Sequence, residues 1–202
     1  MLRHPMLTNM ATSAVIWSSG DLIQQSLFPV DKSKGTTGAA AASSLALTRS
    51  TLATGIFGGI FVGTTGTLWY RSIDTHAAKL FRINTPAFIA YKILLDTVLY
   101  GPLYVAAFFM YSDLTSGGTL ASAIKCAQKE TLPVLLAEIV FWPPYQAFNF
   151  SKVPVRHHLN VVNFGCLLDS TFLCWARQQT DWFGDLAKRL GVTRDDDNRK
   201  KN

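Results

Sequence analysis

Four long apolar segments constrain the fold of this 202-residue chain more than any other feature. They cover residues 6–28, 45–70, 87–111 and 158–176. Each is close to the ~20 residues that an α-helix needs to cross ~30 Å of hydrocarbon. The sequence therefore predicts an all-α integral membrane protein with four transmembrane helices. We expect one four-helix membrane domain over residues 1–192 and a disordered polar tail over residues 193–202.

The composition agrees with burial in a lipid bilayer. Hydrophobic residues make up 49% of the chain and charged residues only 16%, against about 25% charged residues in a typical soluble domain. This balance excludes a disordered protein, because disorder needs low hydrophobicity and high charge. The net charge is +6, but the basic residues fall at the ends of apolar stretches, where they would meet lipid headgroups. We therefore expect the lipid bilayer as the main partner and no direct binding of nucleic acid.

A further segment, residues 119–141, is amphipathic rather than uniformly apolar. Charged residues, among them Lys125 and Glu138, give it a polar side. This pattern predicts an interfacial or re-entrant helix between the third and fourth spans. Proline removes a backbone donor and clashes with the preceding turn, so Pro143 and Pro144 are expected to end this helix.

Ionisable side chains inside apolar segments are the strongest functional indication, because a charge at mid-bilayer costs a few kcal/mol even on lenient insertion scales. Lys92 and Asp96 lie four residues apart on one helix face, where their charges can partly cancel. Asp169 lies well inside the fourth segment, and Glu138 lies near the end of the amphipathic one. One interpretation is that these four residues line a hydrophilic path between helices. The other is a closed network of ion pairs that only holds the bundle together.

Gly55, Gly59 and Gly63 recur every four residues in the second segment. This spacing makes a smooth groove on one helix face and lets another helix approach closely. Packing inside the bundle is the favoured interpretation. The alternative is a seam between copies of the chain in a homo-oligomer.

The sequence shows no pattern of a soluble enzyme. We find no Gly-rich phosphate loop, no nucleophile elbow and no zinc-ligand spacing. The adjacent His157 and His158 point to different sides of a helix, so they cannot chelate one metal together. We therefore expect a protein that is not an enzyme and that uses no metal and no cofactor.

The segment around the double proline resembles a known family signature. Residues 142–154 read W-P-P-Y-Q-A-F-N-F-S-K-V-P. This is similar to the W-P-x-x-Q-x-x-N-F-x-x-V-P signature of the Mpv-seventeen / twenty-two-kilodalton peroxisomal membrane protein family. The matching positions are Trp142, Pro143, Gln146, Asn149, Phe150, Val153 and Pro154. Other parts of the family pattern have counterparts at His4-Pro5, Gly20-Asp21, Gln24, Gly63, Trp69-Tyr70, Asp74, Lys92, Asp96 and Pro102.

The resemblance implies a small integral membrane protein with four spans, in the mitochondrial inner membrane or, alternatively, in the peroxisomal membrane. Some members are described as channels for small solutes, and others are linked to mitochondrial DNA maintenance or mitochondrial ribosome assembly. We therefore expect a channel-like pore for small solutes or metabolites in the mitochondrial inner membrane. The alternative is a non-conducting scaffold that recruits a ribosomal or nucleoid component. The signature itself is expected to be a structural corner, with Pro154 at the start of the next helix.

Overall fold

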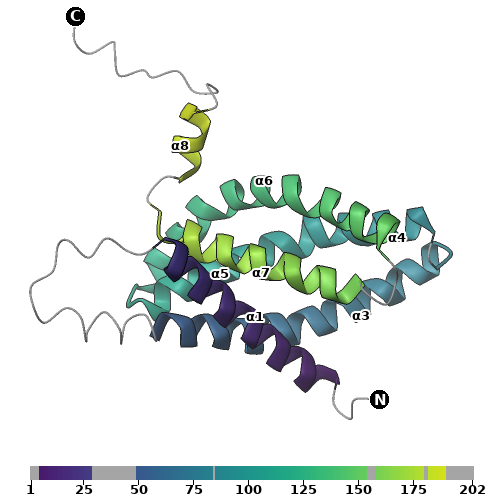
Figure 1. The fold of residues 1–202 in the computed structure, drawn as a ribbon, viewed down its shortest axis with the longest axis horizontal. Helices are drawn as coiled ribbons and strands as arrows, with labels where there is room; N and C mark the ends of the chain where they lie inside the picture. The colour runs from purple at the N-terminus through teal and green to yellow at the C-terminus, as the bar shows by residue number, and fades with distance from the viewer. Residues whose placement is uncertain (1–4, 29–48, 84, 154–157, 180–181, 190–202) are drawn as a thin grey trace, which may run out of the picture.

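A computed structural model describes residues 5–28, 49–83, 85–153, 158–179 and 182–189, and these ranges are almost entirely helical. Long helices lie side by side along the long axis of the molecule, α1 crosses them obliquely, and α8 stands off at one end (Figure 1). Residues 49–56 form the first turns of the second helix. The other elements are α1 (Pro5–Leu27), η2 (Phe57–Val62), α3 (Gly63–Leu80), α4 (Pro86–Leu95), η3 (Asp96–Tyr100), α5 (Gly101–Thr115), α6 (Leu120–Lys152), α7 (His158–Ala176) and α8 (Trp182–Arg189).

The predicted all-α fold is confirmed for the described ranges, and two of its helices have the length and composition of membrane spans. They are Arg49–Leu80 with 32 residues and Pro86–Thr115 with 30 residues. Each is one continuous helix, because η2 and η3 are π-helical turns inside it. The apolar run in α7, Val161–Ala176, is shorter. The expected polar tail, residues 193–202, lies outside the described residues.

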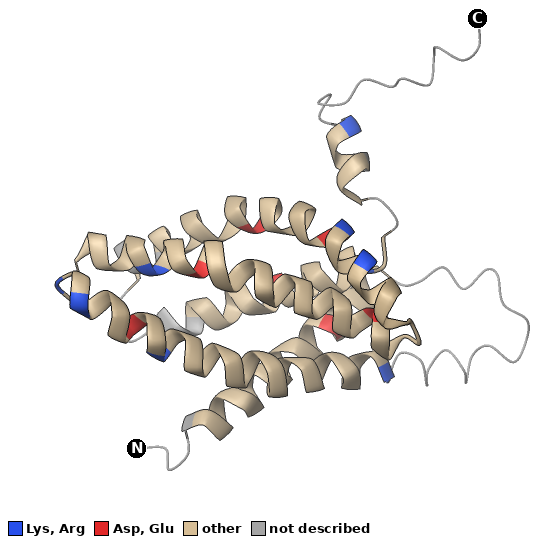
Figure 2. Ribbon diagram, turned by 180° about the vertical axis from the view of Figure 1, so that it is seen from behind, with Lys and Arg blue, Asp and Glu red and all other residues tan. Residues whose placement is uncertain are grey.

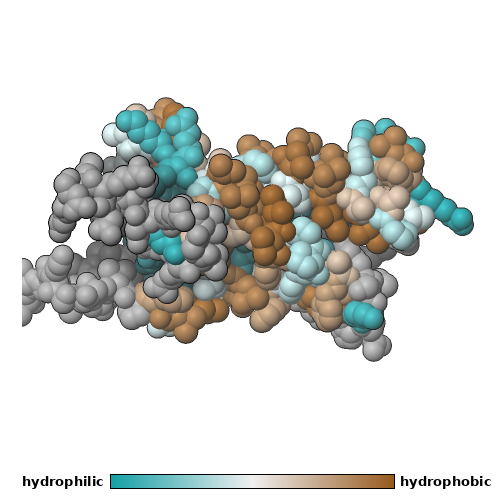
Figure 3. Space-filling model, turned by 90° about the horizontal axis from the view of Figure 1, so that it is seen from above, coloured by the Kyte–Doolittle hydropathy of each residue, from teal (hydrophilic) through white to brown (hydrophobic). Residues whose placement is uncertain are grey.

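The outer surface of the bundle is unusually apolar. Many large hydrophobic side chains are exposed on it, including Leu52, Ile60 and Leu103, and Val140 is 76% exposed. Hydrophobic side chains gather over the middle of the bundle in Figure 3, whereas Figure 2 places Lys and Arg toward its two ends. Exposed apolar surface of this extent marks a face that something other than water covers. Its position between two charged ends suits the acyl chains of a bilayer.

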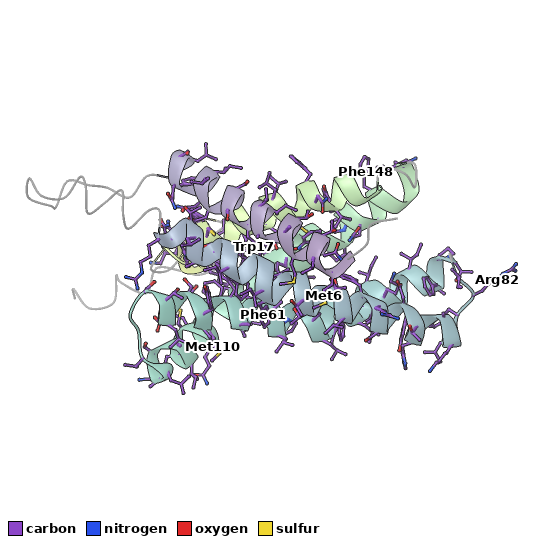
Figure 4. The ribbon with its side chains drawn as sticks, turned by 90° about the horizontal axis from the view of Figure 1, so that it is seen from below. Met6, Trp17, Phe61, Arg82, Met110 and Phe148 are labelled. Carbon is purple, nitrogen blue, oxygen red and sulfur yellow. The ribbon has the colours of Figure 1, made fainter. Side chains whose placement is uncertain are left out.

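The core is built on aromatic side chains from three helices. Trp17 is 3% exposed, and its ring lies 5.2 Å from Phe57, 5.8 Å from Tyr104 and 5.3 Å from Phe108 between centroids. Figure 4 shows Trp17 where α1 crosses the neighbouring helices, whereas Arg82 extends outward from the far tip of the bundle. Aromatic rings bury a large apolar area, so this cluster fixes the crossing point of α1.

The connection between α5 and α6 follows the turn chemistry of its sequence. Gly117 adopts φ 96°, a conformation that costs glycine little because it has no Cβ. The next helix is then capped reciprocally, since the Ser122 N–H donates to Thr119 Oγ1 at 3.2 Å and the Thr119 N–H donates to Ser122 Oγ at 2.9 Å. A glycine turn followed by this cap reverses the chain and starts α6.

The prediction that Pro143 and Pro144 end the amphipathic helix is wrong. α6 runs 33 residues from Leu120 to Lys152 with both prolines inside it, and it packs along α5 as a full member of the bundle. The cost of an interior proline is about 3 kcal/mol, and packing on both sides of the double proline offsets it. The Tyr145 hydroxyl donates to the Val161 carbonyl on α7 at 2.5 Å, on the far side of the prolines.

The signature residues therefore lie on a helix instead of a corner. Trp142, Pro143 and Gln146 belong to α6, and Val153 follows its last turn. Asn149 and Phe150 also belong to α6, but their side chains are outside what the structure describes. Pro154 lies outside the described residues, so the expectation that it starts the next helix stays a prediction.

Pro143→Ala distinguishes a continuous helix from a corner. Alanine restores an N–H that can donate to the Ile139 carbonyl, so we expect unchanged or raised stability, by up to about 3 kcal/mol in the free energy of unfolding, and unchanged helix content. The measurement is circular dichroism of the detergent-solubilised protein during heating. A corner that needed proline would instead lose stability and helical signal.

Candidate functional site: an acidic chamber

A cavity of about 530 Å³ lies between α1, α3, η3, α5, α6 and α7. We call it the acidic chamber, because Asp96, Glu138 and Asp169 are the ionisable carboxylates in its lining. The lining also includes Asn9 and Tyr70, whose side chains are exposed, so the chamber reaches the surface beside α1 and α3. The chamber thus joins three of the four predicted site residues, although they are far apart in the sequence.

The three carboxylates have different numbers of hydrogen-bond donors. Asp96 Oδ1 accepts from Trp69 Nε1 at 2.9 Å, and its Oδ2 accepts from the Tyr70 hydroxyl at 3.1 Å. Asp169 Oδ2 accepts from the Tyr104 hydroxyl at 2.8 Å. Glu138 is 8% exposed, and its buried Oε1 has no hydrogen-bond partner among the residues that the structure describes. The hydrogen-bonding capacity of the chamber's carboxylates is therefore satisfied only in part by the neighbouring side chains.

A π-helical turn positions Asp96 in the wall. Pro102 has no N–H, so the carbonyl four residues before it loses its helical donor. The helix responds with the wider turn of η3, in which the Gly101 N–H donates to the Asp96 carbonyl. Such turns inside α-helices are frequent at functional sites. This wider turn thus places the Asp96 and Tyr100 side chains on the chamber.

Lys92 does not share the chamber with the carboxylates. Its Nζ lies 2.5 Å from Asp74 Oδ1 on α3, and the side chains of Lys92 and Asp74 are 29% and 56% exposed. The partner that the sequence suggested, Asp96, is occupied by Trp69 and Tyr70 instead. The i, i+4 spacing put both residues on one helix face but could not reveal that α3 supplies a closer acid.

Two of the signature side chains face the chamber. Trp142 and Gln146 belong to its lining, one turn apart on α6. Opposite them, α7 approaches closely at Gly165, where a Cβ atom would lie 2.8 Å from the Tyr145 ring and 3.2 Å from the Trp142 ring. The signature therefore serves helix packing and chamber lining together.

The aromatic core borders the inner end of the chamber. Trp17 and Tyr104 belong to both the chamber lining and the core cluster, and Phe108 lies behind them with 1% exposure. One helical turn further along α1, α5 and the end of α7 lie the polar residues Asp21, Ser112 and Arg177. None of these three residues lines the chamber, whose lining on this side includes Trp17 and Tyr104.

The buried polar cluster behind the core was not expected from the sequence. Asp21 is 0% exposed and forms an ion pair with Arg177 at 3.0 Å. Its oxygens also accept from Ser50 at 3.2 Å and from Thr51 at 2.8 Å. Arg177 further donates to Ser112 Oγ at 3.3 Å and to Ser50. Beside it, Gln24 and Gln178 donate to one another at 3.0 and 2.8 Å. An acid in the middle of the first segment was the available signal, but its partner is 156 residues away.

The glycine stripe packs against α1. Cβ atoms at Gly59 and Gly63 would lie 3.1 Å from Ala14 and 2.6 Å from the Met10 Cα atom, and Gly55 faces Ser18 in the same way. The contacting positions thus run in opposite directions along the two helices, four residues at a time. This is close antiparallel packing of the kind that small residues allow. The homo-oligomer seam stays an untested alternative.

These features define the class of the protein: a helical bundle with an apolar outer surface, charged ends and carboxylates enclosed between helices has the construction of an integral membrane protein. Within that class, the chain is similar to the Mpv17 / PMP22 family, whose model matches residues 113–174. That range covers most of α6 and α7, the two helices that carry the signature, Glu138 and Asp169.

Relatives match along most of the chain. Protein SYM1 of Eremothecium gossypii is 27% identical over 175 residues, covering 86% of this chain and 89% of the relative. Protein SYM1 of Saccharomyces cerevisiae is 26% identical over 178 residues, with 86% and 84% coverage. The mitochondrial inner membrane protein Mpv17 of Danio rerio is 27% identical over 175 residues, with 87% and 91% coverage. No solved structure gives a significant match.

Proposed function

We propose that this protein spans an organelle membrane with four helices and provides a narrow passage for small solutes. The four spans are α1, the helices Arg49–Leu80 and Pro86–Thr115, and α7, with α6 packed among them. The observation that carries the proposal is the acidic chamber, because partly satisfied carboxylates enclosed in a membrane bundle mark solute or ion pathways. Solutes would be sorted in the chamber by size and by charge. No catalytic step is part of this proposal.

The mitochondrial inner membrane is the proposed location, and the peroxisomal membrane is the alternative. The support comes from the relative in Danio rerio that is named a mitochondrial inner membrane protein and that matches over most of both chains. A fluorescent fusion imaged against markers of both organelles tests this location. Resistance of the protein to an alkaline carbonate wash tests the embedding itself, since a peripheral protein would be released.

The passage predicts an ion preference that depends on Asp96 and Asp169. The double variant Asp96→Asn, Asp169→Asn keeps the size of both side chains and removes two negative charges from the wall. We expect the permeability ratio of cations to anions to fall severalfold, because the charges on a pore wall set its selectivity. The measurement is the reversal potential of purified protein in planar bilayers under a salt gradient. Asp74→Asn, which removes an acid outside the chamber, is the matched control and should leave the ratio unchanged.

A non-conducting scaffold is the second candidate, and the aromatic packing beside the chamber favours it. Trp17 and Phe108 are buried in the core cluster, with 5.3 Å between their ring centroids. In that case the buried charges stabilise the bundle, and a ribosomal or nucleoid component binds outside the membrane. Reconstituted protein without solute flux, together with a stable co-purifying complex, would support the scaffold over the passage.

A further inference from the structure

The sign of the charge in the acidic chamber is opposite to that of the whole chain. The protein carries a net charge of +6, yet the chamber is lined by three carboxylates and by no Lys, Arg or His among the described residues. The carboxylates come from three separate elements, η3, α6 and α7. A cavity with this lining favours a positively charged occupant, because carboxylates between low-dielectric walls attract cations and raise their local concentration.

Glu138 identifies the point where such an occupant would bind. The oxygens of Asp96 and one oxygen of Asp169 already accept hydrogen bonds from Trp69, Tyr70 and Tyr104. Within the described part of the chain, the Glu138 Oε1 atom has no donor, although the residue is 8% exposed and lines the chamber. A buried acceptor without a donor is costly, and native structures rarely leave one unsatisfied. A ligand with N–H groups would supply the missing donor.

The walls of the chamber indicate an organic cation rather than a metal ion. Within the described residues, no group of three His, Cys, Asp or Glu side chains is arranged to hold a metal ion. Aromatic side chains contribute to the remaining wall, among them Trp17, Tyr100, Tyr104 and Trp142. Aromatic faces attract organic cations, and about 530 Å³ lies in the ordinary range for small-molecule pockets.

We propose that the acidic chamber binds small protonated alkylamines, with the ammonium group donating hydrogen bonds to Glu138 and the alkyl chain lying against the aromatic wall. This names the solute class of the chamber, and its physiological meaning rests on the proposed passage. Three predictions about selectivity follow from the chemistry. Butylammonium binds, because it has both the charge and the N–H donors. Tetramethylammonium binds more weakly, because it has no N–H. Butyrate does not bind, because its charge has the wrong sign.

The test is equilibrium binding to the full chain in nanodiscs, followed by the fluorescence of its tryptophans. We expect saturable binding of butylammonium and a loss of at least about tenfold in affinity for Glu138→Gln, the range for one hydrogen bond to a charged group. Asp74→Asn is the matched control, since it removes an acid outside the chamber and should leave the affinity unchanged. Equal affinities for butylammonium and tetramethylammonium, or an unchanged affinity in Glu138→Gln, would overturn the proposal.

A second measurement uses only the unmodified protein, so it does not depend on the folding of a variant. The hydrophobic reagent dicyclohexylcarbodiimide modifies carboxyl groups in membrane proteins, and peptide mass spectrometry reports the extent at Glu138. We expect butylammonium to slow this modification in a saturable way, whereas butyrate does not. Absence of protection would contradict the proposal. The two proposals can fail independently. Amine binding without solute flux would contradict the proposed passage and support the amine site. Solute flux without saturable amine binding would contradict the amine site and support the passage.

Discussion

Asp21→Ala is expected to lower the free energy of unfolding by about 3–5 kcal/mol, the usual cost of breaking a buried ion pair by removing one partner. Asp21 is 0% exposed, and the side chain of Arg177 is 16% exposed. The substitution leaves Arg177 enclosed without its carboxylate and removes the acceptor used by Ser50 and Thr51. The measurement is reversible unfolding of the detergent-solubilised protein, followed by circular dichroism.

The chain offers an exposed ion pair as the matched control. Lys92 and Asp74 lie 2.5 Å apart with side-chain exposures of 29% and 56%, so Asp74→Ala should cost less than about 1 kcal/mol. Replacing both members of the buried pair, as Asp21→Leu with Arg177→Met, should recover much of the loss, because no unpaired charge remains. Equal losses for Asp21→Ala and Asp74→Ala would show that the buried cluster has no special role in stability.

Local sequence patterns predicted the helices better than their ends. The apolar run at residues 158–176 coincides with α7, because nothing competes with its helical pattern. The end of α6 was misplaced for an identifiable reason. A proline removes one backbone donor wherever it lies, but the outcome depends on neighbours that are distant in the sequence. At Pro102 the helix adopts the π-helical turn η3, and at Pro143 it continues under contacts with α7.

Ionisable residues in apolar segments correctly indicated the helices that line the chamber, but they did not indicate which side chains these residues contact. Asp96, Glu138 and Asp169 were singled out because hydrocarbon penalises charge, and the fold brings all three to one cavity. Lys92 was singled out by the same argument and lies outside the cavity, paired with Asp74. Whether a buried charge lines a cavity or closes an ion pair depends on which helix faces it. The spacing of residues along one helix does not show which other helix packs against it.

Gly63 makes the closest approach to a backbone atom in the glycine stripe, which makes Gly63→Ala the second large expected effect. A Cβ atom at Gly63 would lie 2.6 Å from the Met10 Cα atom and 3.0 Å from the Met10 backbone nitrogen. A backbone cannot rotate out of the way as a side chain can, so α1 must move. We expect a loss of about 2–3 kcal/mol in the free energy of unfolding, at the upper end of the usual cost of overpacking. The measurement is unfolding in detergent, as for Asp21→Ala.

Gly66→Ala, one turn along the same helix, separates the close approach from the general effect of glycine. A Cβ atom there would meet only the Tyr100 hydroxyl at 3.5 Å, an ordinary contact. Alanine favours helix over glycine by up to about 1 kcal/mol, so Gly66→Ala should be neutral or stabilising. The two substitutions are chemically identical and lie in the same helix, so a difference between them reports the contact with α1. If both variants were equally stable, the antiparallel packing of α1 on this stripe would be incorrect. A gain in stability for Gly63→Ala would exclude it outright, because it would mean that the space beside Gly63 is open.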